Sequence, residues 1–174
     1  DYATATVDIT IEGGGGYDVV TAGGGNDVLV FNTGDADTQN VASGNFEIVN
    51  SFSTANDTID LQVAPLLHGV DSISGVTLGG VGGGSLTIDA AGKVTATAGG
   101  GAGTISLSEM VNAVNTLVSG NGEIGFFELP DGNTYVFQQN GASANDTLIC
   151  LSGVTSIVDF VTTHPGDANT LFIK

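Results

Sequence analysis

Two adjacent nine-residue segments hold the groups best suited to chemistry. Residues 13–21 read Gly-Gly-Gly-Gly-Tyr-Asp-Val-Val-Thr and residues 22–30 read Ala-Gly-Gly-Gly-Asn-Asp-Val-Leu-Val, so Asp18 matches Asp27 without a gap. Glycine permits positive φ and tight turns, in which several carbonyl oxygens can converge on one point. The aspartate adds a charged oxygen, and carboxylate and carbonyl oxygens together suit a hard cation such as Ca²⁺.

We therefore predict calcium ligands in both segments, with aspartates giving carboxylates and glycines giving carbonyl oxygens. The predicted ligands of the repeats are Gly14, Gly16, Asp18, Gly23, Gly25 and Asp27. Four later aspartates, which could complete or cap a site, are Asp35, Asp37, Asp57 and Asp60. The plain alternatives are a glycine-rich hairpin for the repeats and ordinary turn or strand-end roles for Asp57 and Asp60.

Charge and missing motifs exclude several classes of function. The chain has 19 acidic residues against two basic ones, a net charge of −17, so no basic patch can bind nucleic acid. A plain alternative for the acids is solubility alone. Neither a His-Glu-x-x-His zinc motif nor a Gly-x-Ser-x-Gly elbow occurs, so we predict no catalytic residue. No lysine follows the glycines as in a phosphate loop, and no apolar run approaches the ~20 residues that span a bilayer.

The paired segments resemble the Gly-Gly-x-Gly-x-Asp-x-apolar-x nonapeptide of RTX proteins, which bacteria secrete. The first segment matches every defined position, and the second departs only at Ala22. The resemblance implies a parallel β-roll in which each nonapeptide forms half a coil. Turns on one side of such a roll are two segments apart, so Asp18 and Asp27 would lie on opposite sides. Their expected partners are the 32–37 loop and the Asn56–Asp57 turn, or a neighbouring molecule.

The remaining sequence predicts a mainly β fold with one short helix. The helix is expected over 106–118, where Ser106 and Glu109 have capping-box spacing and an apolar stripe follows at helical spacing. Between 62 and 104 we expect a small antiparallel sheet of short strands separated by glycine turns. Further strands are expected at 5–12, 46–52, 103–105, 123–129, 134–138, 147–151 and 170–174.

Two regions are expected, packed together as a single unit. Residues 1–61 would form the roll and its cap, and residues 62–174 a β-sandwich-like region carrying the helix. His68 is expected to be structural, and Cys150 to serve as a small apolar residue within a strand.

The resemblance also suggests a setting for the protein. The end of the chain, from Gly132 onward, resembles the C-terminal cap of RTX surface proteins, which carries a type I secretion signal. The start at Asp1 has no Met or apolar leader, so we expect the chain to belong to a longer protein. We expect a calcium-dependent, self-associating structural protein at the bacterial cell surface. The alternatives are the secretion and folding module of an RTX enzyme and the end of an RTX adhesin.

Overall fold

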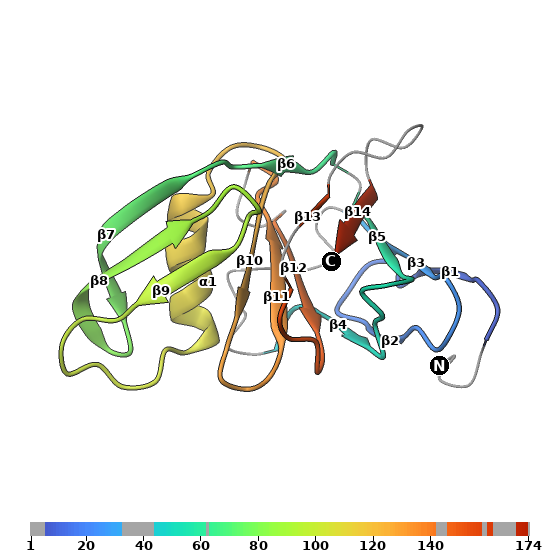
Figure 1. The fold of residues 1–174 in the computed structure, drawn as a ribbon, viewed down its shortest axis with the longest axis horizontal. Coiled ribbons are helices and arrows are strands. Elements are labelled where there is room, and N and C mark those ends of the chain that lie inside the picture. The colour runs from blue at the N-terminus through green and yellow to red at the C-terminus, as the bar shows by residue number, and fades with distance from the viewer. Residues whose placement is uncertain are drawn as a thin grey trace.

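The computed structural model describes residues 6–32, 44–61, 63–141, 146–157, 160–161 and 170–173. These residues form fourteen strands and one helix, arranged in three sheets (Figure 1). The strands are β1 (Thr10–Glu12), β2 (Val19–Thr21), β3 (Val28–Phe31), β4 (Glu47–Asn50), β5 (Thr58–Leu61), β6 (Leu66–Leu67), β7 (Asp71–Leu78), β8 (Val81–Ile88), β9 (Val94–Thr97), β10 (Glu123–Glu128), β11 (Thr134–Gln138), β12 (Thr147–Leu151), β13 (Phe160–Val161) and β14 (Thr170–Ile173), and the helix is α1 (Leu107–Leu117). The mainly β fold with one short helix that the sequence predicts is confirmed.

The first five strands form a parallel roll. They alternate between a five-stranded sheet (sheet A, order β1-β3-β5-β14-β13) and a six-stranded sheet (sheet B, order β2-β4-β12-β11-β10-β6). Thr10 lies beside Val28, 18 residues later, so two nonapeptides complete one coil. The apolar residue at position eight of each nonapeptide points into the core: Val20 is 8% exposed and Leu29 is 1% exposed. The later coil is longer, because Val19 lies beside Ile48.

Strands from the C-terminal half extend both sheets of the roll. β12 pairs in parallel with β4, and β14 pairs antiparallel with β5. Hydrogen-bonded sheets thus run across the boundary expected between residues 61 and 62. Whether the two sides also fold as one unit stays a prediction.

Sheet B separates two apolar cores. In β10–β12 successive side chains point to opposite faces, as the pleat of a strand requires. Phe126, Val136 and Ile149 join the core between sheets A and B. Phe127 and Phe137, in contrast, join a second core on the other face. These strands are buried on both faces, which accounts for their largely apolar sequences. They lie at the centre of the molecule (Figure 1).

A three-stranded antiparallel sheet (sheet C, order β7-β8-β9) and α1 cover this second core. The Ser106 side chain caps α1 by accepting a hydrogen bond from the Glu109 backbone N–H. The Glu109 carboxylate in turn accepts a hydrogen bond from the Ser106 backbone N–H, which completes the predicted capping box. The antiparallel sheet and the hairpin of β10 and β11 also match the prediction.

Two predicted strands differ from the structure. Residues 103–105 form a loop, because Gly103 donates its N–H to the carbonyl of Gly79 in the β7–β8 turn and has no strand beside it in the described structure. The strand predicted at 5–12 is confined to Thr10–Glu12 within the described part. Residues ahead of it contribute instead to a turn beside Gly25.

Candidate metal site in the turns of the roll

Four of the seven glycines in the two repeats adopt the left-handed backbone that the sequence predicts. Gly14 and Gly16 have φ of +84° and +123°, and their counterparts Gly23 and Gly25 have +96° and +135°. The two turns therefore repeat the same backbone conformation nine residues apart. Left-handed glycines turn backbone carbonyls in directions that a regular strand does not allow, which is what a site built from carbonyl oxygens needs.

Asp27 is the most buried aspartate of the two repeats, at 1% exposure. Its Oδ1 accepts the N–H of Ile9 at 3.1 Å, from the neighbouring coil. Its Oδ2 is buried and has no hydrogen-bond partner. A carboxylate oxygen that is buried and unpaired is costly, and a proton or a cation would relieve that cost.

Asp57 lies in the turn stacked on Asp27, as the prediction of partner turns requires. Its Oδ1 accepts the Asp27 backbone N–H at 3.1 Å, and its Oδ2 accepts the Ser53 N–H at 2.8 Å. Burial raises the pKa of Asp57 above its ordinary value, and the nearby charge of Asp27 adds to the rise, while the two hydrogen bonds oppose it. The stack therefore concentrates negative charge in a place poor in water.

Asp18 lies on the opposite side of the roll, in the turn that leads into β2. Its backbone N–H donates to Glu47 Oε2 at 3.1 Å, and its own Oδ2 is buried without a hydrogen-bond partner. A Cβ added to Gly13 would lie 2.6 Å from this oxygen, so the glycine leaves room for the carboxylate. The two repeat aspartates thus occupy opposite sides, each beside an acidic residue of the next coil.

The other predicted ligands are placed as follows. Asp35 and Asp37 lie outside the described residues. Asp60 lies within β5, paired with Val30 and Thr170, so the structure does not group it with the turn carboxylates. Its role as a ligand stays a prediction.

Two acidic residues in the turns escaped the sequence prediction. Glu47 is 1% exposed beside Asp18, and Asp8 accepts both the backbone and side-chain N–H of Asn26, at 2.8 and 3.1 Å. A signal for Glu47 was present: Glu47-Ile-Val repeats the acidic-apolar-apolar order of Asp18-Val-Val and Asp27-Val-Leu. A single glycine, Gly44, stands shortly before Glu47 in place of the run of glycines, which concealed the equivalence.

Among the described residues, no three His, Cys, Asp or Glu side chains gather closely enough to hold a metal ion by themselves. Calcium takes six to eight oxygen ligands, many of them backbone carbonyls in glycine-rich turns. The buried oxygens of Asp18 and Asp27 fit the anionic part of such a set. The carbonyls of the left-handed glycines would supply the remainder.

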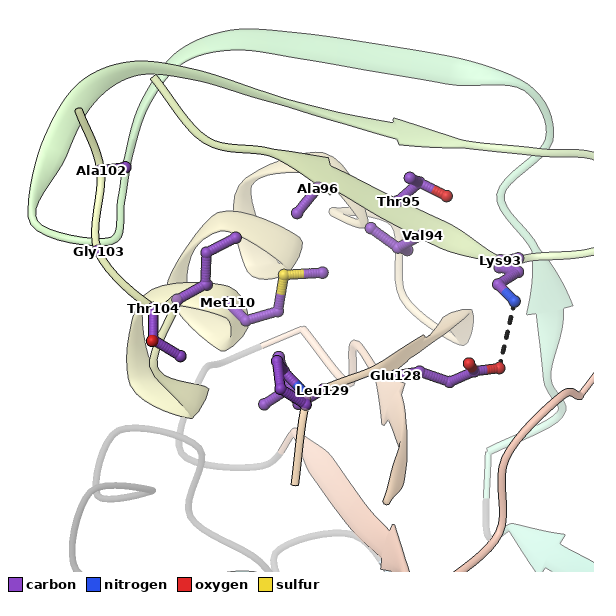
Figure 2. Close-up of a pocket in the computed structure, with 12 residues that line it drawn as sticks. Lys93, Val94, Thr95, Ala96, Ala102, Gly103, Thr104, Met110, Glu128 and Leu129 are labelled. Carbon is purple, nitrogen blue, oxygen red and sulfur yellow. Dashed lines mark hydrogen bonds and ion pairs between the residues drawn. The ribbon is translucent and has the colours of Figure 1, made fainter. Parts of the chain in front are cut away.

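A separate cavity of about 700 Å³ opens between β9, the following loop, α1 and the end of β10 (Figure 2). It is lined by Lys93, Val94, Thr95, Ala96, Ala102, Gly103, Thr104, Ile105, Met110, Glu128, Leu129 and Pro130. Lys93 Nζ lies 3.2 Å from Glu128 Oε1, so the charges at this edge of the cavity neutralise each other. The lining is otherwise apolar or weakly polar.

No family model, curated protein or solved structure matches this chain. Within the described part of the chain, no helix has the length and apolar character needed to cross a membrane.

Proposed function

We propose that this chain is a calcium-binding β-roll protein whose glycine-rich turns become ordered when calcium binds. The observation that carries the proposal is Asp27, a carboxylate that is 1% exposed, has one oxygen without a hydrogen-bond partner, and is stacked on Asp57. Without a cation the two negative charges repel each other at close range in a poorly hydrated site. A divalent cation would turn this repulsion into attraction.

Residues of this chain have distinct parts in the proposal. Asp18 and Asp27 would supply carboxylate ligands on the two sides of the roll, with Glu47 and Asp57 contributing charge from the next coil. Carbonyls of Gly14, Gly16, Gly23 and Gly25 would complete the ligand sets. Bound calcium would neutralise the carboxylates and hold neighbouring coils together at their turns.

We further propose a structural, self-assembling role outside the cell, at a bacterial surface or in a matrix. Calcium sites of extracellular modules commonly bind the ion at submillimolar to millimolar concentrations, which are available outside the cell. At the low calcium concentration of a cytoplasm the turns would stay unordered, a state compatible with export. The repeating parallel roll with sheet edges supports assembly as its purpose.

Calorimetric calcium titration of the wild type, Asp27→Asn and the control Asp89→Asn tests the proposal. Asp89 is an exposed turn aspartate far from the roll in sequence, and its Oδ1 accepts the N–H groups of Ala91 and Lys93. We expect Asp27→Asn to weaken binding about tenfold or more, about 1.4 kcal/mol, because a charged ligand is lost. Asp89→Asn should bind like the wild type. Equal calcium affinity in all three proteins would refute the assignment of Asp27.

A further inference from the structure

The cavity beside α1 lies where two sheets separate. β9 and β10 are bridged in parallel at Lys93 and Phe126, and the Phe126 N–H donates to Gly92 O at 2.9 Å. Past this bridge no further pairing between the two strands occurs in the described structure, and the cavity of about 700 Å³ opens between them (Figure 2). All of its lining residues lie between 93 and 130, within the run 63–141 that the structure describes without a gap.

The outer edge of β9 presents backbone groups beside the cavity. The Asp89 N–H donates to Lys93 O, so Lys93 and, two residues later, Thr95 face β8. Alternation along an antiparallel pair directs the N–H and carbonyl groups of Val94 and Ala96 away from β8. Because β9 is an edge strand of sheet C, Ala96 has no strand on that side within the described structure. A donor and an acceptor at strand spacing are therefore presented to an occupant of the cavity.

β10 presents backbone groups from the opposite wall. The Leu129 N–H donates to Asn133 O on the side of β11, so the preceding residue, Glu128, directs its backbone groups away from β11. β6 pairs only with the first two residues of β10 and does not reach Glu128. Both strands that flank the cavity thus turn strand-edge groups toward the space between them.

The side chains that reach the cavity are mainly apolar. Val94 and Ala96 lie on the cavity side of β9, and Met110 and Leu129 reach toward them from α1 and from the end of β10 (Figure 2). The volume of about 700 Å³ lies within the ~300–1,000 Å³ that is typical of ligand pockets. The space is therefore suited to apolar groups of a ligand.

The charge around the cavity favours a basic ligand. Lys93 is the only lysine or arginine among the described residues, and Glu128 Oε1, 3.2 Å from its Nζ, also accepts the Ser156 N–H. Two exposed carboxylates stand close by in the chain: Asp89, which accepts the Lys93 N–H, and Asp131, which follows the lining residue Pro130. With one cation against three carboxylates, this margin attracts a cationic side chain and repels an anionic one.

We infer that the cavity binds an extended peptide, which adds as a strand to the outer edge of β9, places alternate apolar side chains against Met110 and Leu129, and carries a basic residue toward Glu128. In strand addition, main-chain hydrogen bonds provide affinity and pockets for alternate side chains provide specificity. An apolar small molecule would fill the cavity without using the backbone groups of Ala96. An acidic peptide or a nucleic acid would be repelled. The inference goes beyond the proposed function and does not depend on calcium.

Binding of a synthetic peptide to the full chain, measured by fluorescence anisotropy in chelator and in calcium, tests the inference. The probe is acetyl-Lys-Val-Thr-Val-Thr-Val-Lys-amide, and the same peptide with glutamate in place of both lysines is its charge control. Ala96→Pro removes the outward N–H of β9 and no hydrogen bond to β8. Ala90→Pro is the matched control, because Ala90 is exposed and is the second residue of the turn closed by the Gly92 N–H and Asp89 O, a position that accepts proline.

Two further measurements separate binding from folding. Thermal unfolding of each variant shows whether it is folded. Amide hydrogen exchange of the wild type, with and without the lysine-flanked peptide, needs no variant. We expect the peptide to slow exchange of the Ala96 amide, because that N–H becomes a hydrogen-bond donor to the peptide.

We expect the lysine-flanked peptide to bind the wild type and Ala90→Pro within about twofold of each other, and Ala96→Pro about tenfold or more weakly, because an edge hydrogen bond is lost. The glutamate-flanked peptide should bind the wild type more weakly than the lysine-flanked one. Equal affinity of the two proline variants, or unchanged exchange at Ala96, would overturn the inference. Saturable binding of hexanol without binding of either peptide would also overturn it, and would assign the cavity to apolar small molecules.

Discussion

At the scale of single residues, the free-energy cost of burying a carboxylate affects the protonation of the turn residue Asp57. Asp57 has its pKa raised chiefly by burial, and a group with a raised native pKa favours the protonated form. Its contribution to stability is therefore fully present below the unfolded value of 3.8 and is lost as the pH rises through the native pKa. Near neutral pH, calcium would replace the proton as the neutralising partner.

His68 gives a residue-scale prediction that does not involve calcium. Its Nδ1 lies 2.7 Å from Glu123 Oε2, and its Nε2 lies 3.3 Å from Asp71 Oδ2. Burial alone lowers the pKa of His68, but the two carboxylates outweigh burial and raise the pKa above 6.5. The protonated histidine thus stabilises the link between the β6–β7 connection and the start of β10.

We expect NMR titration to show a His68 pKa above 6.5 that falls in Asp71→Asn. The second histidine resonance is assigned with the variant His164→Gln. Because the native pKa is raised, the stability that His68 contributes is complete below about pH 6.5 and disappears as the pH rises through the native pKa. A His68 pKa at or below 6.5 would contradict the ion pairs.

Only some of the residues in the candidate metal site could be predicted from the sequence. Asp18 and Asp27 stood out because glycines repeat in front of them, and Asp57 because Asn56-Asp57 echoes Asn26-Asp27. Glu47 follows no such repeated pattern. Its position beside Asp18 became apparent only from the strand register, which sets Val19 beside Ile48. Register between coils of unequal length is a tertiary property, which no local pattern encodes.

At the scale of elements, the glycine turns are held by close contact between neighbouring coils. Gly25 has φ of +135°, and an added Cβ would lie 2.7 Å from Val7 O. Gly15 offers a matched control in the other repeat: it has no positive φ, and an added Cβ would meet nothing within 4 Å. The requirement for glycine therefore differs between the two positions.

We predict that Gly25→Ala lowers the free energy of unfolding by about 1–3 kcal/mol, because it adds both backbone strain and a steric clash. Gly15→Ala should change it by less than about 1 kcal/mol in either direction, since a compatible Gly→Ala change mainly restricts the unfolded chain. Chemical denaturation of both variants and the wild type in calcium measures the difference. Equal losses in the two variants would show that close packing of the coils does not govern the turn.

Local signals predicted the elements whose structure is set locally. The helix begins where the spacing of Ser106 and Glu109 predicts a capping box. The turn of the β10–β11 hairpin lies at Pro130-Asp131-Gly132-Asn133, as predicted. The prediction of a strand at 103–105 was wrong, because the backbone N–H of Gly103 donates to the carbonyl of Gly79 in the β7–β8 turn. Propensity cannot anticipate such a tertiary contact.

At the scale of the whole molecule, sheet B unites the roll with the C-terminal half. β12 continues the parallel order of β2 and β4, although it lies almost 100 residues after β4 in the sequence. Its neighbours β10 and β11 are buried on both faces, so the roll is continued at one end by strands that belong to a large apolar core. We expect the core to stay folded without calcium and the early coils to depend on calcium.

Thermal unfolding with and without calcium tests the central claim most directly. One site at a calcium concentration a hundredfold above its Kd stabilises the protein by about 2.7 kcal/mol, which corresponds to a rise in Tm of about 5–10 °C for a chain of this size. We predict such a rise at a calcium concentration a hundredfold above the Kd measured by calorimetry, its reversal by chelator, and a much smaller rise in Asp27→Asn. An unchanged Tm in saturating calcium would contradict the account, because the turns of the roll would then be ordered without the ion.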